Sequence, residues 1–235
     1  MCLQRLRRPV GRAPQHRPLR RPGQSLDRVR PPRALTGPGR RPWVVFDLDG
    51  TLLDSDAALL APFVELGIPA EDVAFGPLLA AECARLGLSV GDYLARYDVT
   101  AARPFPGVAD LLAGVDRWAV CSNKVSASGR AELARLGWEP ALALFAEDFG
   151  GRPKVLGPVL EALSLAPDAV VFVGDTAHDR HCAAEVGCAF ALAGWNPRAL
   201  PEPGDTVLSR PADVLPLLAD AGGRRRRPDG REEPE

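Results

Sequence analysis

Three short apolar runs in this chain, each typical of a buried strand, end in residues that can do chemistry. In an open α/β sheet the carboxyl ends of parallel strands face one crevice, where ligands bind. We therefore group the residues that follow the runs: Asp47, Asp49, Gly50 and Thr51, then Ser122 and Asn123, then Gly174, Asp175, Thr176 and Asp179. Lys154, at the start of a predicted helix between the second and third runs, joins this group.

Three or four carboxylates in one crevice would repel one another unless positive charge offsets them. A hard divalent cation such as Mg²⁺, which prefers oxygen ligands, would supply that charge together with Lys154. The cation would also polarise a phosphoryl oxygen and shield an anionic nucleophile from an anionic substrate. The pattern therefore predicts a Mg²⁺ site at which a carboxylate attacks phosphate.

This set of residues resembles the motifs of the haloacid dehalogenase superfamily phosphatases, which carry Asp-x-Asp-Gly-Thr, a strand-ending Ser or Thr, a Lys, and Gly-Asp followed by another Asp. All four motifs occur here in order, at residues 47–51, Ser122, Lys154 and residues 174–179, so the resemblance covers about residues 43–220. Each motif alone is a weak signal, since the first could be an Asx turn and the last a helix N-cap, but the four together are a strong one.

The resemblance implies a role for each matching residue. Asp47 would be the nucleophile that forms an aspartyl-phosphate, and Asp49 the acid that protonates the leaving oxygen and later activates water. The implied phosphate-binding residues are Thr51, Ser122, Asn123 and Lys154. The implied Mg²⁺ ligands are Asp47, Asp49 through its backbone carbonyl, Asp175 and Asp179.

Two features narrow the expected chemistry. The dehalogenases that give the superfamily its name lack an acid at the position of Asp49, because a halide leaves without a proton, whereas an alkoxide needs one. The triplet Ser122-Asn123-Lys124 resembles the phosphoglycolate phosphatase branch, although a solvated first-turn position explains Lys124 equally well. We expect a phosphatase for small phosphomonoesters; a phosphomutase, or a non-catalytic interaction protein that uses its Arg-rich ends, remains an alternative.

The elements that must position these residues follow from the pattern of the chain. Apolar runs at 43–46, 118–121 and 169–173 alternate with helical patterns, which predicts a parallel sheet. Further strands are expected at 188–192 and 206–208, and helices near 107–114, 126–137, 154–164, 177–187 and 211–220. The predicted fold class is a doubly wound α/β core, Rossmann-like by its resemblance to the superfamily.

Residues 57–98 break this alternation, because they contain helix-like stretches and no convincing strand. The resemblance places a small helical cap there, so we expect a core of residues 42–56 and 104–221 and a cap of residues 57–103. The polar residues available in or beside the cap are interpreted as solvated or structural: Arg85, Tyr93, Arg96, Tyr97 and Arg103. Trp195 and Asn196 are interpreted as packing in a loop beside the crevice.

The ends of the chain are basic and its middle is acidic. Residues 1–41 contain twelve Arg, seven Pro and one acidic residue, which predicts a disordered tail, and residues 222–235 are also too polar to pack. Residues 42–221 contain 25 acidic and 12 basic side chains, a formal charge of −13. Such a domain is not expected to bind nucleic acid, so only the Arg-rich N-terminal tail could do so.

Composition also indicates where in the cell the protein is expected. No apolar run is long enough to span a bilayer, and the five Cys lack metal-type spacing and suit reduced core thiols. We therefore expect a cytoplasmic enzyme whose partner is a small phosphorylated metabolite, with no membrane contact. The sequence leaves the oligomeric state open.

Overall fold

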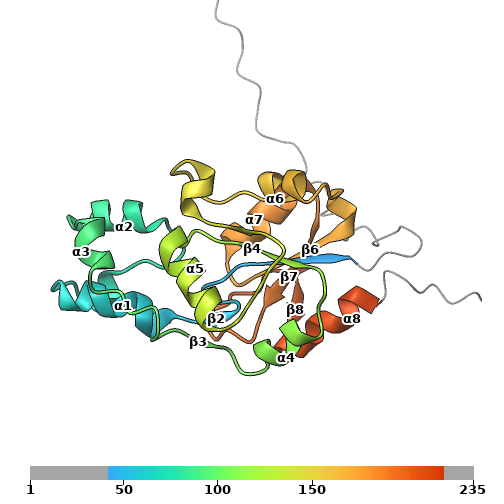
Figure 1. Ribbon diagram of the computed structural model, residues 1–235, viewed down its shortest axis with the longest axis horizontal. Coiled ribbons are helices and arrows are strands. Elements are labelled where there is room, and N and C mark those ends of the chain that lie inside the picture. The colour runs from blue at the N-terminus through green and yellow to red at the C-terminus, as the bar shows by residue number, and fades with distance from the viewer. Residues whose placement is uncertain (1–41, 220–235) are drawn as a thin grey trace, which may run out of the picture.

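The computed structural model describes residues 42–219, which form a parallel sheet with helices on both faces (Figure 1). The six strands lie in the order β5-β4-β1-β6-β7-β8, and every neighbouring pair is parallel. Their bounds are β1 Trp43–Phe46, β4 Trp118–Cys121, β5 Ala143–Leu144, β6 Val170–Gly174, β7 Ala189–Ala193 and β8 Thr206–Leu208. The predicted doubly wound α/β fold is confirmed.

The strand order brings the predicted site residues to one edge. From β1 the chain passes to β4 and β5 on one side, and then crosses back to β6 on the other side of β1. The carboxyl ends of β1, β4 and β6 are therefore neighbours at the point where the winding direction reverses. Open α/β sheets bind ligands at such a point.

Side chains of the buried strands alternate between two apolar layers. Val44 and Phe46 point into one layer and Val45 into the other, as the two-residue period of a strand requires. Helices α4 Val108–Ala113, α5 Ser126–Arg135 and α8 Val214–Ala219 cover the first layer. Helices α6 Gly157–Ala162 and α7 Ala177–Val186 cover the second.

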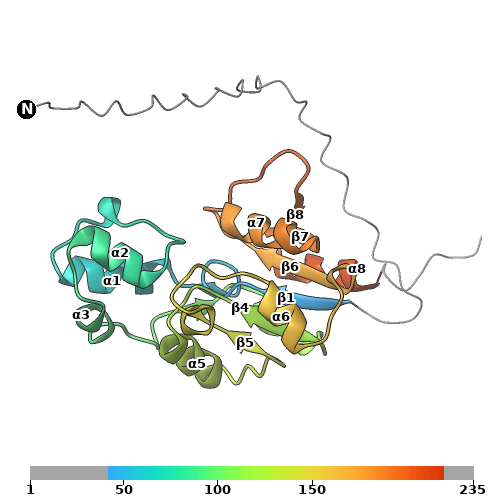
Figure 2. The same cartoon turned by 90° about the horizontal axis from the view of Figure 1, so that it is seen from above.

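A helical insertion, residues 55–102, interrupts the core between β1 and α4. It contains α1 Asp56–Glu65, a 3₁₀ turn Ala70–Asp72, α2 Leu79–Leu86 and α3 Val90–Leu94. These helices pack around their own apolar cluster of Phe63, Cys83 and Tyr93, and Figure 2 shows them to one side of the sheet. The antiparallel pair β2 Leu53–Asp54 and β3 Arg103–Pro104 joins the two ends of the insertion. Helices therefore occur where the cap is expected, and its role over the site stays a prediction.

Some predicted bounds shift. The helix expected at 154–164 begins at Gly157, so Lys154 lies in the loop before α6 rather than at a helix start. Pro158 explains the shift, because it lacks an N–H group and suits the first turn of a helix. The helix expected at 211–220 begins as a 3₁₀ turn, Pro211–Asp213, and β5 was not predicted because two residues give no period to detect. Further 3₁₀ turns lie at Ala146–Phe149 and Pro167–Ala169.

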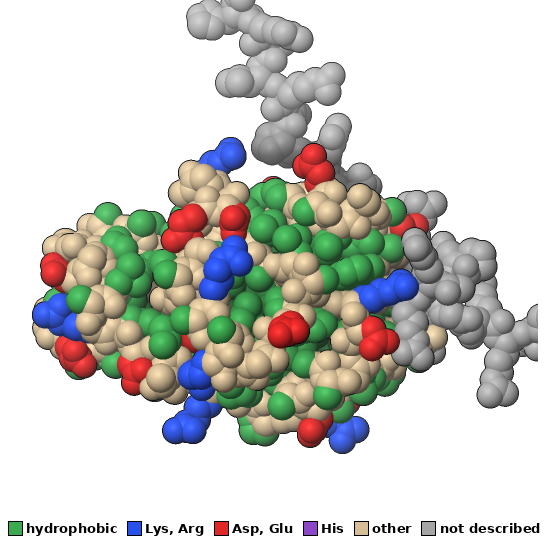
Figure 3. Space-filling view, viewed as in Figure 1, with side chains coloured by type: hydrophobic (Ala, Val, Ile, Leu, Met, Phe, Trp, Pro, Cys, Tyr) green, Lys and Arg blue, Asp and Glu red, His purple; other side chains and the backbone are tan. Residues whose placement is uncertain are grey.

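The predicted tails, residues 1–41 and 222–235, lie outside the described residues. Among residues 42–219, none of the helices combines the length and the apolar content needed to cross a bilayer. On the face shown in Figure 3, acidic and basic side chains are interspersed and the visible basic side chains do not merge into one patch. Whether the body of the domain binds nucleic acid stays a prediction.

A close helix–sheet contact generates a prediction about stability. A Cβ atom added to Gly129 on α5 would lie 2.3 Å from the ring of Phe145, which is fully buried and cannot move aside. Gly129→Ala should therefore lower the free energy of unfolding by about 1–2 kcal/mol, despite the better helix propensity of Ala. Urea denaturation measures the loss.

Gly157→Ala is the matched control, because a Cβ atom at that helical position meets no atom within 4 Å. It should leave the unfolding free energy unchanged or raise it slightly. Equal stability of the two variants would contradict the close packing of α5 on the sheet.

Candidate active site

Three carboxylates gather at the carboxyl edge of the sheet. Asp47 follows β1, Asp175 follows β6 and Asp179 lies in the first turn of α7, and all three are buried. One oxygen of each lies within 4.8 Å of those of the other two. The Lys154 ammonium is 2.8 Å from Asp47 Oδ1 and 2.7 Å from Asp179 Oδ1. One ammonium against three carboxylates leaves a negative excess that suits a divalent cation.

Burial and neighbouring charges shift the pKa values of the groups in this cluster in different directions. Desolvation raises the pKa of Asp47 to about 6 and the pKa of Asp175 to about 7, in the protein without a cation. Burial also disfavours the ionised form of Asp179, but the Lys154 ammonium and hydrogen bonds from Thr176 lower its pKa overall. Burial disfavours the charged Lys154 as well, yet Asp179 and Asp47 raise the pKa of its ammonium. Lys154 and Asp179 therefore form a fixed ion pair, while Asp47 and Asp175 are the groups that a cation would ionise.

The sequence positions Asp179 through a helix cap. Thr176 is the N-cap of α7, and its hydroxyl accepts a hydrogen bond from the backbone N–H of Asp179. Asp179 Oδ2 in turn accepts from the backbone N–H and the hydroxyl of Thr176, at 2.9 and 2.6 Å. The Gly-Asp-Thr segment is thus a helix cap and part of the acidic cluster at once, because the second Asp oxygen remains for Lys154.

Asp175 is oriented by two residues that the sequence assigned otherwise. Its Oδ1 accepts from the hydroxyl of Thr51 at 3.2 Å, and its Oδ2 accepts from the side-chain amide of Asn196 at 2.8 Å. Asn196 also donates to the carbonyl oxygen of Gly50 at 2.9 Å, so it is more than a packing residue. Thr51 is fully buried and does not line the cavity, and its role in binding phosphate stays a prediction.

Gly50 is required by this arrangement. Its φ of +76° lies in the left-handed region, and a Cβ atom there would lie 2.3 Å from Asp175 Oδ2. The turn after β1 can therefore bring its backbone against Asp175 because residue 50 has no side chain.

Ser122 and Asn123 line the cavity on the other side of Asp47, at the end of β4. The Ser122 hydroxyl accepts from the backbone N–H of Lys124 at 3.3 Å, which leaves its proton free to donate to a ligand. Asn123 Oδ1 accepts from the backbone N–H of Lys154 at 2.7 Å, and its amide donates to the carbonyl of Gly76 at 3.1 Å. Asn123 thus joins three segments around the cavity, one of them in the insertion.

Asp49 is held by a second buried lysine. Lys124 Nζ lies 2.7 Å from Asp49 Oδ1, 3.1 Å from Glu132 Oε2 and 2.9 Å from the Tyr97 hydroxyl, and its side chain is 4% exposed. The Tyr97 hydroxyl donates to Glu132 Oε1 at 2.6 Å. The solvated alternative for Lys124 is therefore wrong, and Tyr97 is a structural residue that reaches the site.

Glu132 was not predicted. It lies on α5, and its side chain is fully buried. The one signal in the sequence is a charged residue four positions from both Ser128 and Leu136, on the face of the helix that turns toward the protein. A buried charge of this kind needs a partner, but the sequence pattern does not say which one.

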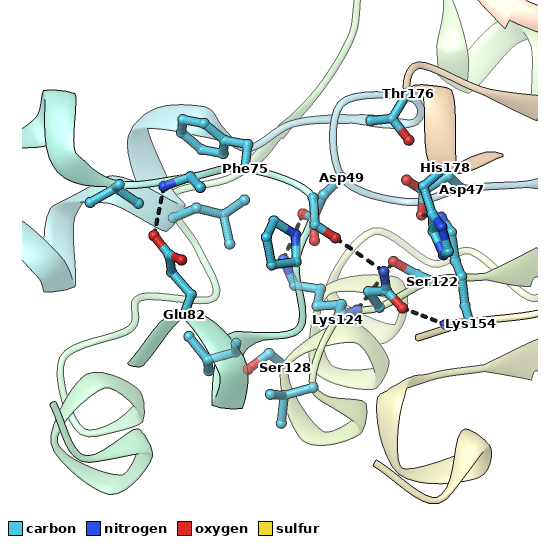
Figure 4. A pocket seen from close by; sticks show the side chains of 18 of the residues that line it. Asp47, Asp49, Phe75, Glu82, Ser122, Lys124, Ser128, Lys154, Thr176 and His178 are labelled. Atoms are coloured by element: carbon cyan, nitrogen blue, oxygen red, sulfur yellow. Dashed lines mark hydrogen bonds and ion pairs between the residues drawn. The ribbon is translucent and has the colours of Figure 1, made fainter. Parts of the chain in front are cut away.

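The cavity over these residues measures about 130 Å³ and is lined by both the core and the insertion. Figure 4 shows Asp47, Lys154 and His178 at one end and Phe75 with Glu82 at the other, with Asp49 between them. His178 is half-buried, and burial lowers the pKa of its imidazole. The arrangement can bind an anion beside a cation at one end and enclose an attached organic group at the other.

Comparison with known proteins gives consistent likenesses. Residues 89–193 match the family model described as haloacid dehalogenase-like hydrolase. Over 188 residues the chain is 34% identical to the probable phosphatase IndB of Dickeya dadantii, with 66% of this chain and 82% of that protein covered. Over 205 residues it is 30% identical to the phosphoglycolate phosphatase of Xanthomonas campestris, with 73% of this chain and 90% of that protein covered.

A solved structure shares the fold. The haloacid dehalogenase-like family hydrolase from Streptococcus pneumoniae superposes with a TM-score of 0.61 at 23% identity, covering 74% of this chain and 97% of that chain. At this identity the likeness concerns the arrangement of helices and strands.

The acidic cluster generates a prediction about pH. The folded-state pKa values of Asp47 and Asp175, about 6 and 7, exceed the ordinary value of 3.8, so the folded protein binds more protons than the unfolded chain between about pH 4 and pH 7. Stability must then fall as pH rises through that window. In chelator, the Tm should fall by several degrees between about pH 5 and pH 8, at about 2–4 °C per kcal/mol.

Asp175→Asn should flatten this dependence, because it removes one of the two titrating carboxylates. The exposed Asp110→Asn is the matched control and should keep the wild-type slope. A Tm that rose with pH in the wild-type protein would contradict the arrangement of the cluster.

Proposed function

Because the chain belongs to the haloacid dehalogenase-like hydrolases, we propose that it is a Mg²⁺-dependent phosphatase that hydrolyses small phosphomonoesters through an aspartyl-phosphate on Asp47. The observation that carries the proposal is that two carboxylates two residues apart have different surroundings. Asp47 belongs to the acidic cluster and pairs with Lys154, whereas Asp49 lies outside that cluster and pairs with Lys124. This difference in surroundings supports assigning the attack to Asp47 and the proton exchange to Asp49.

The donor set fits a divalent cation. Asp47 and Asp175 offer carboxylate oxygens on the cavity side, and the Asp49 backbone carbonyl is the third group expected to bind. One carboxylate oxygen of Asp179 accepts hydrogen bonds from Thr176 and the other pairs with Lys154. We therefore propose that Asp179 positions Lys154 rather than coordinating the cation directly. A bound Mg²⁺ would polarise the phosphoryl group and offset the charge of the nucleophile.

The reaction then has two steps. A carboxylate oxygen of Asp47 attacks phosphorus, the bond from phosphorus to the leaving oxygen breaks, and Asp49 gives that oxygen a proton. Asp49 next takes a proton from water, the water oxygen attacks phosphorus, and inorganic phosphate leaves with Asp47 restored. Ser122 and Lys154 are the side chains expected to hold phosphoryl oxygens throughout, together with Asn123.

Lys124 positions Asp49 in this scheme. Its ammonium, fixed by Glu132 and Tyr97, holds Asp49 at the junction between the phosphate end of the cavity and the insertion. In the proposed reaction the leaving oxygen lies at this junction, within reach of Asp49.

The phosphomutase alternative uses a bound sugar in place of water as the phosphoryl acceptor. Competition between added acceptors and water during turnover separates the two reactions. The cytoplasmic location remains a prediction.

The two Asp roles are separable by experiment. Asp47→Ala and Asp49→Ala should each lose nearly all turnover, and excess chelator should abolish wild-type turnover. Asp47→Ala should also fail to form a beryllium-fluoride adduct, because it lacks the attacking oxygen, while Asp49→Ala should still form one. Fluorine nuclear magnetic resonance of the adduct in Mg²⁺ is the measurement. An adduct on Asp47→Ala, or full activity in chelator, would sink the mechanism.

Positioning of Asp49 gives another prediction. Lys124→Gln should lower kcat/KM at least about tenfold on an alkyl phosphate, equivalent to about 1.4 kcal/mol of transition-state stabilisation. It should affect para-nitrophenyl phosphate less, because that leaving group departs without a proton. Steady-state kinetics on both substrates measures the difference.

A folding defect would not produce this leaving-group dependence. As a check, Lys124→Gln combined with Glu132→Gln removes the unpaired buried carboxylate and should recover stability without recovering activity. Glu161→Gln, at an exposed position of α6, is the control and should leave kcat/KM unchanged for both substrates. Equal losses on both substrates would count against positioning of the acid.

A further inference from the structure

The end of the cavity that would hold the leaving group is apolar. Its wall, here called the insertion wall, comes from the helical insertion and consists mainly of Leu59, Phe63, Val73, Phe75, Leu79 and Leu94. Phe63 belongs to the apolar cluster of the insertion, and Val73, Leu79 and Leu94 pack against it. Figure 4 shows Phe75 on the side of Asp49 away from Asp47. An organic group attached to a phosphate at Asp47 would therefore extend toward hydrocarbon.

Each cation that lines the cavity is already paired with carboxylate. Lys154 forms ion pairs with Asp47 and Asp179, and Lys124 forms ion pairs with Asp49 and Glu132. The third cation is Arg198, which pairs with Asp56 at the start of α1. Its guanidinium also lies 4.1 Å from the ring centre of Phe75. Among the described residues that line the cavity, none offers an unpaired cation to the leaving group.

The one further charge in this part of the lining is negative. The Glu82 side chain is 5% exposed, and its Oε1 accepts from the backbone N–H of Ala74 at 2.6 Å. Arg85 donates to its Oε2 at 2.9 Å from outside the cavity. A substrate carboxylate placed here would leave water without gaining a free cation, because the charged groups in this part of the lining are already paired. Such a burial is unfavourable, whereas a hydrocarbon group loses no polar solvation.

We propose that the substrate is a phosphomonoester of a small, uncharged, apolar alcohol rather than of a hydroxy acid such as glycolate; the inference rests on the phosphatase function proposed above. The cavity volume of about 130 Å³ bounds the size of that alcohol. A cavity of roughly 150 Å³ holds one benzene molecule, and the volume here also includes the phosphate end beside Asp47 and Lys154, so the alcohol must be smaller than a six-carbon ring.

The test compares three phosphomonoesters in Mg²⁺, with kcat/KM as the readout. Isoamyl phosphate carries an apolar alcohol, glycerol phosphate a neutral polar one, and phosphoglycolate an anionic one. Isoamyl phosphate should exceed phosphoglycolate at least tenfold, with glycerol phosphate between them. Equal or better hydrolysis of phosphoglycolate would overturn the substrate class.

The same assay separates this failure from failure of the proposed function. Hydrolysis of para-nitrophenyl phosphate with a preference for phosphoglycolate would retain the phosphatase and reject the apolar leaving group. No Mg²⁺-dependent hydrolysis of any of the four esters would reject both.

A variant pair locates the selectivity in the insertion wall. Phe75→Lys adds an unpaired cation beside the leaving group and should lower the ratio of isoamyl phosphate to phosphoglycolate at least threefold. Val64→Lys adds the same charge to α1 at a position that is 52% exposed and does not line the cavity, and it should keep the wild-type ratio. Thermal unfolding checks that both variants fold. An unchanged ratio in a folded Phe75→Lys would overturn the assignment to this wall.

Discussion

The confinement of three carboxylates at one buried edge of a sheet is the constraint on which the rest of this structure depends. Asp47, Asp175 and Asp179 come from two strand ends and a helix, and their mutual repulsion must be offset before the core can close over them. Lys154 supplies one positive charge between two of them. Burial first, and then the remaining negative charge, raises the pKa values of Asp47 and Asp175, and a cluster of this kind suits a divalent cation.

The same solution occurs a second time along the same cavity, where Lys124 pairs with Asp49 and Glu132. The chain contains 27 Arg and two Lys, and both lysines are buried among carboxylates at the site. A lysine ammonium is compact and can contact carboxylates on several sides, whereas a guanidinium is planar and prefers a forked pairing. In the proposed reaction, Lys154 would hold the nucleophile Asp47 and Lys124 would hold the proton-transfer residue Asp49. The rarity of lysine in this sequence therefore points to both positions equally, although only Lys154 belongs to the four superfamily motifs.

Lys124 also ties the helical insertion to the chemistry. Tyr97, which follows α3, contacts both Lys124 and Glu132, so the chain leaving the insertion is anchored beside Asp49. Asn123 makes a second tie through the carbonyl of Gly76. One polar network thus holds both Asp49, the proposed proton donor, and the insertion that is proposed to contact the leaving group. The apolar insertion wall takes no part in this network, and in our proposal it selects the leaving group by shape and by the absence of charge.

Residues close together in the chain were the ones that the sequence by itself determined. The strand ends with Asp47, Asp49 and Asp175, and the α/β alternation, follow from local periods and turn chemistry. Only the tertiary structure decided that Asn196 and Thr51 orient Asp175 and that Glu132 lies against Lys124. The physical reason is that these partners lie far apart in sequence or belong to different elements. A period shows that a position is buried, but which polar groups meet there depends on how helices and loops pack across the sheet.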